Sequence, residues 1–371
     1  MERGVPVRVK VDGRVGIDAT FFREMNPNYL RPQVEKYNST GVDVDGTYYI
    51  DLDALLDEQI QREKERVKSD GAAAFDINND DYLTCCPTIP GFSFKDNAFY
   101  EFAVEDISDI KWSHTLFKSL TIPDEQRAIL TALARTRMGV VPAIPFDDFV
   151  AGKGCGLSVL LFGPPGVGKT LTAEATAEHL ERPLYPIPTA QLVTRPDFLE
   201  DNLKHTFKIA KHFDALLLLD EANIFLERQS SFNSTKDGVI TIFLRIMEYF
   251  QGMFFLTTNR ETEFDEAILS RIHMKIKYPG LSQQQRKNIW KHFISRACTL
   301  QGPAAIDDRY LNHLAATDIN GRDIKNLMAV AHALTTMDGT RIDRTYIERA
   351  STSNEDFSRE FNRVKVHSIY T

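Results

Sequence analysis

The chain has 371 residues, of which 43% are hydrophobic and 26% charged, and its formal net charge is -8. This composition excludes a disordered chain, and the length exceeds one ordinary core, so two or three folding units are expected. The acidic balance argues against nucleic acid as a partner, because a phosphate backbone attracts basic surfaces.

The first 81 residues carry weak signals for secondary structure. The alternation in residues 7–11, VRVKV, predicts a strand. Residues 51–68 predict a helix with an apolar stripe, and its charged second half indicates a solvated helix or a linker. Residues 69–81 are small and polar, which is typical of a loop.

An aromatic stretch follows before the first strong helix signal. Its members are Phe92, Phe94, Phe99, Tyr100, Phe102, Trp112 and Phe117. A surface that stacks on bases would interleave such rings with Lys or Arg, so we interpret these rings as core side chains. A helix is then predicted over residues 124–137, with Pro142 and Pro145 ending it.

From residue 157 the pattern alternates between strands and helices. Strands are predicted at residues 158–162, 184–187, 215–219, 253–256 and 274–278, and helices at 169–181, 197–212 and 239–250. The continuous apolar run of the third strand is typical of a buried parallel strand. The alternation predicts an α/β fold, with a parallel sheet covered by helices on both faces.

After residue 280 the strand signals stop. Helices are predicted at residues 282–297, 307–316, 321–337 and 344–349, which together indicate a small helical domain appended to the sheet.

The strongest motif is the glycine-rich segment at residues 163–170, which matches G-x-x-x-x-G-K-[ST] in full. Glycines let the backbone turn its N–H groups toward phosphate oxygens, and the following helix offers its positive end to the same charge. Lys169 is expected on the β- and γ-phosphates and Thr170 on Mg2+. The predicted nucleotide-binding residues are Gly163, Pro164, Pro165, Gly166, Val167, Gly168, Lys169, Thr170, Leu171 and Asp220.

Two further polar groups follow predicted strands. Asp220 and Glu221 end the strand at 215–219, where ligands of parallel sheets bind. Asp220 is expected to hold Mg2+ and Glu221 to activate the attacking water, whereas a helix-capping acidic pair is the alternative. Asn259 follows the next strand, where its amide is placed to orient that water or to cap a loop.

These motifs resemble those of the AAA ATPases. GPPGVGKT at 163–170, LLLLDEA at 216–222 and LTTNRETEFDEAILSRIH at 256–273 are similar to the Walker A motif, the Walker B motif and the second region of homology. The resemblance covers roughly residues 110–350. It implies a P-loop NTPase core over residues 111–280 and a helical lid with a C-terminal tail over 281–371.

Other segments resemble one subgroup, the AAA ATPases of filamentous fungi that carry an extra N-terminal domain. They are FDDFVAGKGCG before the P-loop, FLERQS after Walker B, and the stretches at residues 13–29 and 85–107. This resemblance implies a mixed α/β N-terminal accessory domain over residues 1–110.

The family pattern also assigns residue roles. It repeats the roles above for Lys169, Thr170, Asp220 and Glu221, and places Asn259 at sensor 1. Arg271 corresponds to the arginine finger, which reaches into a neighbouring subunit's site. Arg322 corresponds to sensor 2 at the start of a lid helix, and a surface helix arginine is its alternative.

The sequence departs from the family pattern at three places. Asn223 ends the acidic run after Walker B, and Met274 lies near the place of a second arginine. Residues 194–197 occupy the stretch where protein-threading members carry an aromatic pore residue, and Phe198 is out of place for it. These departures put polypeptide threading in doubt and leave the ATP chemistry intact.

The resemblance implies Mg2+-dependent ATP hydrolysis that remodels a macromolecular partner, a protein rather than a nucleic acid, by a ring-shaped homo-oligomer such as a hexamer. One alternative is an ATP-binding assembly or sensing protein with little turnover, against which Glu221, Asn259 and Arg271 argue. A nucleic-acid remodeller is a second alternative, against which the acidic charge argues.

Signals for the compartment are weak but agree. Residues 1–13 lack the apolar core of a signal peptide, and the run at 215–219 is far shorter than the ~20 residues that span a bilayer. The cysteines lack metal-ligand spacing and are interpreted as reduced thiols; they are Cys85, Cys86, Cys155 and Cys298. We therefore expect an intracellular, cytoplasmic protein without a transmembrane segment.

Overall fold

A computed structural model describes residues 9–27, 29, 86–139, 141, 156–187, 199–223, 234–260 and 264–353. The helix and the loop predicted within residues 51–81 lie outside this part of the chain. Packing separates two compact units. The first comprises Met1–Arg14, Phe94–Asn97 and Ile110–Thr371, and the second comprises Val15–Ser93 and Ala98–Asp109.

The described part of the second unit forms an antiparallel sheet and one α-helix. Strands β1 (Val15–Ile17), β2 (Thr88–Ser93) and β3 (Ala98–Ala103) pair in that order, and β3 leads into the 3-10 turn Val104–Asp106. Helix α1 (Ala19–Met25) begins where the Asp18 side chain accepts the N–H of Phe21. Phe22 is buried and meets Phe99 edge-on at 5.5 Å between ring centroids. Among the predicted core rings, Phe92, Phe94 and Phe117 are buried, whereas Phe99, Tyr100, Phe102 and Trp112 are half-buried.

The strand predicted at residues 7–11 is wrong for the residues that are described. Residues 9–11 form no strand, and the Val9 side chain is 57% exposed. The chain first pairs six residues later, where Val15 lies opposite Ser93. An alternating pattern produces a strand only when a partner strand pairs with it, and residues 9–11 pair with no strand in the described part of the chain.

The first unit is built on a five-stranded sheet. Its strands are β4 (Leu157–Phe162), β5 (Leu184–Ile187), β6 (Leu216–Leu219), β7 (Met253–Thr258) and β8 (Met274–Lys277), in the spatial order β5-β6-β7-β4-β8. Every neighbouring pair is parallel. This confirms the predicted α/β fold, and all four residues of β6 are buried.

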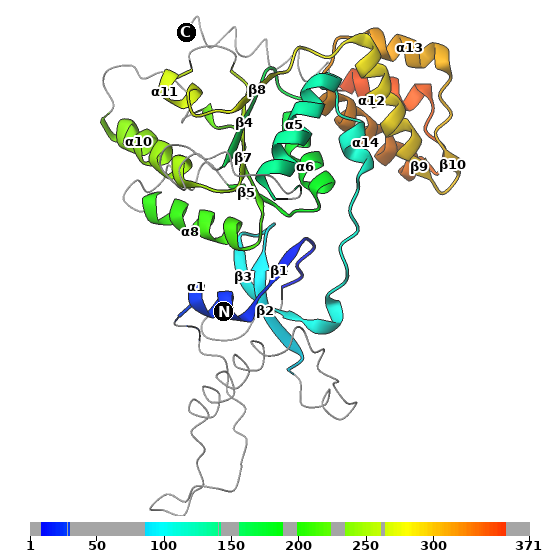
Figure 1. Cartoon of the computed structure of the whole chain (residues 1–371). Helices are drawn as coiled ribbons and strands as arrows, with labels where there is room; N and C mark the ends of the chain where they lie inside the picture. The colour runs from blue at the N-terminus through cyan, green and yellow to red at the C-terminus, as the bar shows by residue number, and fades with distance from the viewer. Residues whose placement is uncertain are drawn as a thin grey trace, which may run out of the picture. The chain divides into compact units, whose positions relative to one another are not determined.

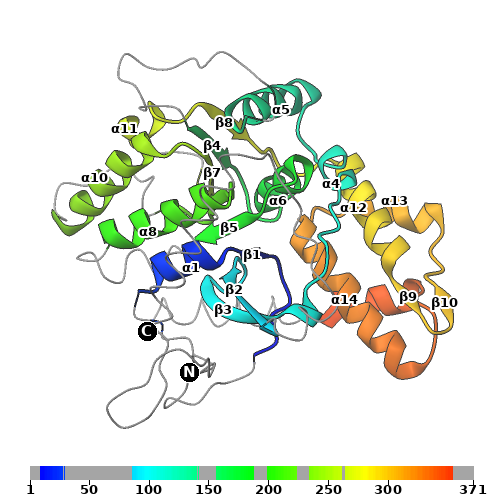
Figure 2. The same cartoon turned by 60° about the horizontal axis from the view of Figure 1, so that its bottom comes forward.

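Helices cover both faces of this sheet (Figures 1 and 2). Helices α4 (Thr115–Lys118), α5 (Asp124–Arg137) and α6 (Lys169–Leu180) lie on one face, and α8 (Leu199–His212) and α10 (Ser234–Tyr249) on the other. Val159 belongs to the core beneath α5 and α6. Phe254, on the opposite face, packs against Phe207 of α8 and Phe243 of α10. Because successive side chains of a strand point to opposite faces of the sheet, the strands contribute to one core on each face.

Helix α5 ends at Arg137 as predicted, and Gly139 takes a left-handed φ of 68° just beyond the cap, which ends the helix before the prolines. Strand β7 runs two residues past its predicted end, because Thr257 and Thr258 pair with the end of β4 and are buried.

The helices that follow β8 form a small lid. They are α12 (Gln283–Arg296), α13 (Asp308–Ala316), α14 (Gly321–Asp338) and a helical stretch over residues 344–353, with a hairpin of β9 (Cys298–Thr299) and β10 (Gly302–Pro303) between the first two. Side-chain caps begin all three named helices, at Ser282, Asp307 and Asn320. The fully buried Trp290 lies in the lid core. No helix in the described ranges has the length and apolarity to cross a membrane.

Candidate functional site

The P-loop connects the carboxyl end of β4 to the N-terminus of α6. Its geometry depends on glycine: Gly163 has φ 139°, and a Cβ there would lie 2.2 Å from the carbonyl oxygen of Tyr278. Gly168 caps α6 with φ 101°, so no side chain covers the first turn of the helix. The free N–H groups of that turn suit a bound phosphate.

Lys169 lies at the centre of this loop. Its ammonium donates to the carbonyls of Gly163 and Pro164 at 2.7 Å and to the Oδ1 of Asn259 at 2.8 Å. Burial lowers the pKa of Lys169, the charge of Arg322 lowers it further, and Asp220 opposes both effects. The lysine is thus fixed between the P-loop and the end of β7, where the predicted sensor 1 lies.

Thr170 and Asp220 form the second part of the site. The Thr170 hydroxyl lies 3.1 and 3.3 Å from the two carboxylate oxygens of Asp220, at the ends of α6 and β6. A hydroxyl and a carboxylate are hard oxygen donors that Mg2+ accepts, and Mg2+ commonly takes only one or two protein ligands beside phosphates. The Thr170 hydroxyl and the Asp220 carboxylate fit this kind of site.

Glu221 leaves β6 through an unusual backbone conformation. Its φ of 53° is in the left-handed region, which is unfavourable for a residue with a Cβ. The N–H of Glu221 donates to the Oγ1 of Thr257 at 3.0 Å, and the N–H of Ala222 donates to the Thr257 carbonyl at 2.8 Å. Thr257 also donates its hydroxyl proton to Asp220.

The lid reaches the P-loop through the start of α14. The N–H of Gly321 donates to the carbonyl of Gly166 at 2.9 Å. Asn320, which caps α14, lies so near that a Cβ on Gly166 would meet its Oδ1 at 2.4 Å. Arg322 is exposed in the first turn of this helix, and its charge acts on Lys169. Arg322 therefore lies beside the P-loop, as a sensor-2 residue would.

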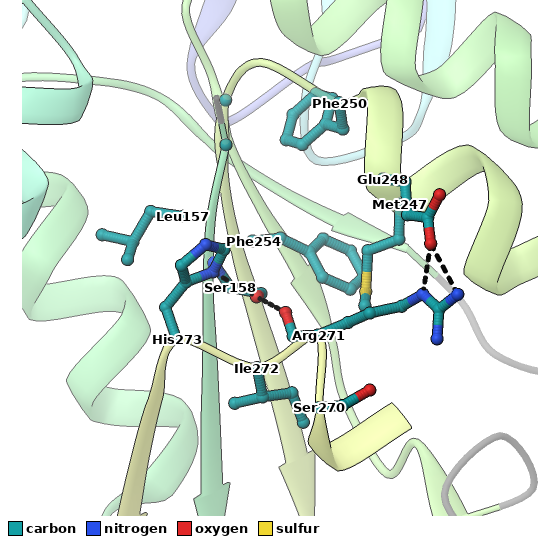
Figure 3. Close-up of a pocket in the computed structure, with 12 residues that line it drawn as sticks. Leu157, Ser158, Met247, Glu248, Phe250, Phe254, Ser270, Arg271, Ile272 and His273 are labelled. Carbon is teal, nitrogen blue, oxygen red and sulfur yellow. Dashed lines mark hydrogen bonds and ion pairs between the residues drawn. The ribbon is translucent and has the colours of Figure 1, made fainter. Parts of the chain in front are cut away.

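Arg271 lies at the opposite end of the sheet. It lines a pocket of about 520 Å³ beside the amino ends of β4 and β7 (Figure 3). The Arg271 carbonyl accepts from the Ser158 hydroxyl at 2.5 Å, and its guanidinium pairs with Glu248 of α10 at 2.5 and 2.7 Å. Helix α11 (Glu266–Leu269) ends just before it, and Arg271 Nη1 donates to the Ala267 carbonyl.

His273 connects the same segment to β4. The ring Nδ1 of His273 accepts the backbone N–H of Ser158 at 3.2 Å. The backbone N–H of His273 donates to the Ser158 carbonyl at 3.0 Å. Burial, together with the charge of Arg137, lowers the pKa of His273.

The structure thus divides the predicted site residues into two groups. Lys169, Thr170, Asp220 and Asn259 meet at one edge of the sheet, Arg322 lies nearby, and Arg271 is separate. Leu171 is 41% exposed in the first turn of α6. The predictions for residues 194–198 and for the FLERQS segment lie outside the described residues.

The sequence prediction missed three residues that contact this machinery, namely Thr257, Glu248 and Asn320. Thr257 had one available signal, a hydroxyl residue at the end of an apolar strand beside Asn259. Glu248 had none, because it contacts Arg271 from a helix 23 residues earlier in the chain.

Removal of the Lys169 side chain should weaken ATP binding. Charge-assisted contacts to phosphate contribute roughly 1.5–3 kcal/mol, so Lys169→Ala should lose about tenfold to a hundredfold in affinity, measured by calorimetric titration. Lys275→Ala, at an exposed lysine of β8, is the control and should bind ATP like the parent. Equal affinity in Lys169→Ala and the parent would refute the assignment of Lys169.

Comparisons with known proteins agree with this geometry. The family model described as ATPase family associated with various cellular activities (AAA) matches residues 159–279. Spastin of Drosophila erecta and spastin of Drosophila melanogaster are each 28% identical over 194 residues, or 49% of this chain. The match covers only 25% of those two proteins.

A solved structure shares the fold. The crystal structure of the FIGL-1 AAA domain aligns with a TM-score of 0.50 at 17% identity, and the alignment covers 66% of this chain and 85% of that one. At this identity the likeness concerns the fold alone.

Proposed function

We propose that this chain, which contains an AAA ATPase domain matched over residues 159–279, hydrolyses ATP with Mg2+ to change the conformation of a protein partner. One observation carries the proposal. Two hydrogen-bonded pairs, Lys169 with Asn259 and Thr170 with Asp220, lie at the carboxyl edge of the parallel sheet, where ligands of such sheets bind.

The residues divide the chemistry between them. Lys169 and the first turn of α6 bind the phosphates, and Thr170 with Asp220 would hold Mg2+. Bound Mg2+ neutralises charge on the β- and γ-phosphates. Glu221 takes a proton from a water whose oxygen attacks the γ-phosphorus, the bond to the bridging oxygen breaks, and ADP and phosphate leave. Asn259 orients that water.

Phosphate release by the purified chain tests this function. We expect steady release with ATP and Mg2+, and loss of release when EDTA removes the metal, because the phosphate charge is then unscreened. Lys169→Ala, purified identically, controls for a contaminating ATPase. ATP binding without any phosphate release would contradict the proposal and support an ATP-dependent assembly or sensing protein instead.

The partner and the assembly are parts of the same proposal. The acidic net charge of -8 favours a protein partner over nucleic acid. Arg271 lines a pocket beside the amino ends of β4 and β7, whereas the P-loop follows the carboxyl end of β4. A ring-shaped homo-oligomer, a hexamer by analogy with the family, would supply Arg271 from a neighbouring subunit. A protein that associates with Glu221→Gln in ATP, and not with Lys169→Ala, would identify the partner.

A further inference from the structure

We propose that Thr257 is a positioning residue for Asp220 and Glu221, an inference that rests on the proposed ATP hydrolysis. Thr257 is the fifth residue of β7 and only 1% exposed. Strands β6 and β7 are parallel neighbours, with Leu219 opposite Leu256. Thr257 therefore lies beside the point where β6 ends and the two acidic residues begin.

Thr257 forms hydrogen bonds with three consecutive residues that follow strand β6. A threonine hydroxyl has one proton and accepts with its lone pairs. The proton goes to Asp220 Oδ1, the oxygen accepts the N–H of Glu221 at 3.0 Å, and the Thr257 carbonyl accepts the N–H of Ala222 at 2.8 Å. No other residue type supplies this donor and acceptor on a β-branched side chain that suits a buried strand.

The contact with Asp220 fixes the direction of its carboxylate. Asp220 is exposed, and the last bond of its side chain is a soft torsion, so a partner on the buried side restricts its rotation. Thr257 holds it from the buried side, and Thr170 lies 3.1 Å away on the exposed side. The carboxylate is thereby set toward the second expected ligand of Mg2+ before any metal binds.

The contact with Glu221 stabilises a costly backbone conformation. A left-handed φ on a residue with a Cβ persists only when its surroundings determine it, and such residues cluster at functional sites. The two N–H groups that follow Asp220 both donate to Thr257, so this turn is held at its start. A small displacement of a catalytic group can lower a rate about 100-fold, so the position of this turn matters for Glu221.

The test compares Thr257→Val with Thr257→Ser. Valine keeps the shape and loses the hydroxyl, whereas serine keeps the hydroxyl. We expect Thr257→Val to lower kcat by about tenfold to a hundredfold, with little change in KM for ATP, and to raise the Mg2+ concentration that gives half-maximal rate. Thr257→Ser should return to within a few-fold of the parent in both measures.

A binding measurement separates this inference from the proposed function. In the parent, Mg2+ should tighten ATP binding relative to EDTA. Thr257→Val should keep the affinity measured in EDTA and lose most of the gain from Mg2+. This readout needs no turnover, so it tests Thr257 even if the parent releases no phosphate, which would contradict the hydrolytic function alone.

Thr335→Val is the matched control for a purely structural effect. Thr335 is fully buried in the lid, and its hydroxyl bonds only to carbonyls of its own helix. Thr335→Val should leave kcat and the Mg2+ dependence at parental values, whatever it does to Tm. If Thr257→Val does not fold, the smaller Thr257→Ala replaces it in each comparison. Parental kcat and Mg2+ dependence in the variant without the hydroxyl, or equal defects in Thr257→Ser, would overturn the inference.

Discussion

Glu221→Gln should slow ATP hydrolysis by about 100-fold or more while ATP binding stays at the parental level. Glutamine matches the size of glutamate but does not accept a proton from water at neutral pH, so the general base is lost. Binding is retained because Lys169, Thr170 and the first turn of α6 bind the phosphates independently of Glu221.

The control for this variant is Glu181→Gln. Glu181 also has a left-handed φ, 55° against 53° for Glu221, and it ends α6 away from the P-loop. Glu181→Gln therefore makes the same exchange in the same backbone conformation, at a residue that we do not place in the catalytic site. Phosphate release and calorimetric ATP titration are measured for both variants. Unchanged release in Glu221→Gln would assign the base to another residue and favour a capping role for the acidic pair.

The sequence predicted the sheet and the P-loop because both are local patterns. A continuous apolar run predicts a buried parallel strand whatever the rest of the chain does, and β5 was predicted to the residue. The phosphate loop depends on glycine at fixed spacing, so the letters themselves carry its geometry. The positions of Asp220 and Asn259 were predictable from these strands, because the carboxyl ends of parallel strands lie at one edge of a sheet.

Contacts between distant elements were not predictable in the same way. The bond from Thr257 to Asp220 depends on the register between β6 and β7, which a single sequence does not specify. The pairing of Arg271 with Glu248 depends on where α10 lies against the sheet. The short strands β1, β2 and β3 lack a strong hydrophobic period and were not predicted. The strand predicted at residues 7–11 was wrong because alternation alone does not show whether a side chain such as Val9, which is 57% exposed, is buried.

Arg271→Ala should bind ATP normally and hydrolyse it roughly 10^3-fold more slowly. The rate should fall because the variant loses the charge that we propose Arg271 supplies to a neighbouring site. The position of Arg271 relative to its own P-loop supports this proposal. Arg271 is tied to Ser158 near the start of β4, whereas the P-loop follows Phe162 at its end. Four residues of a strand span ~13 Å, and Glu248 holds the guanidinium beside the pocket at the amino edge (Figure 3). This position supports the proposal that the cation serves the ATP of a neighbouring subunit.

A trans arginine also makes the activity depend on assembly. Specific activity should rise with protein concentration, and light scattering should show a larger mass in ATP than without it. The activity should depend on concentration because a site without its neighbour lacks the charge that stabilises the transition state. The mass should rise in ATP because a ligand bound at the interface stabilises the assembly. A monomeric mass in ATP, with specific activity independent of concentration, would contradict this arrangement.

Mixing two inactive variants tests the trans contact directly. In rings formed from Arg271→Ala and Lys169→Ala subunits, some interfaces join an intact Lys169 site to an intact Arg271 of the neighbour, so partial activity should return. A mixture of Lys169→Ala and Glu221→Gln is the control. Both subunits then carry Arg271, but every site lacks either Lys169 or Glu221, so no combination of neighbours completes one. Recovery in the first mixture and none in the second requires Arg271 to act across the interface, whereas no recovery in either would rule that out.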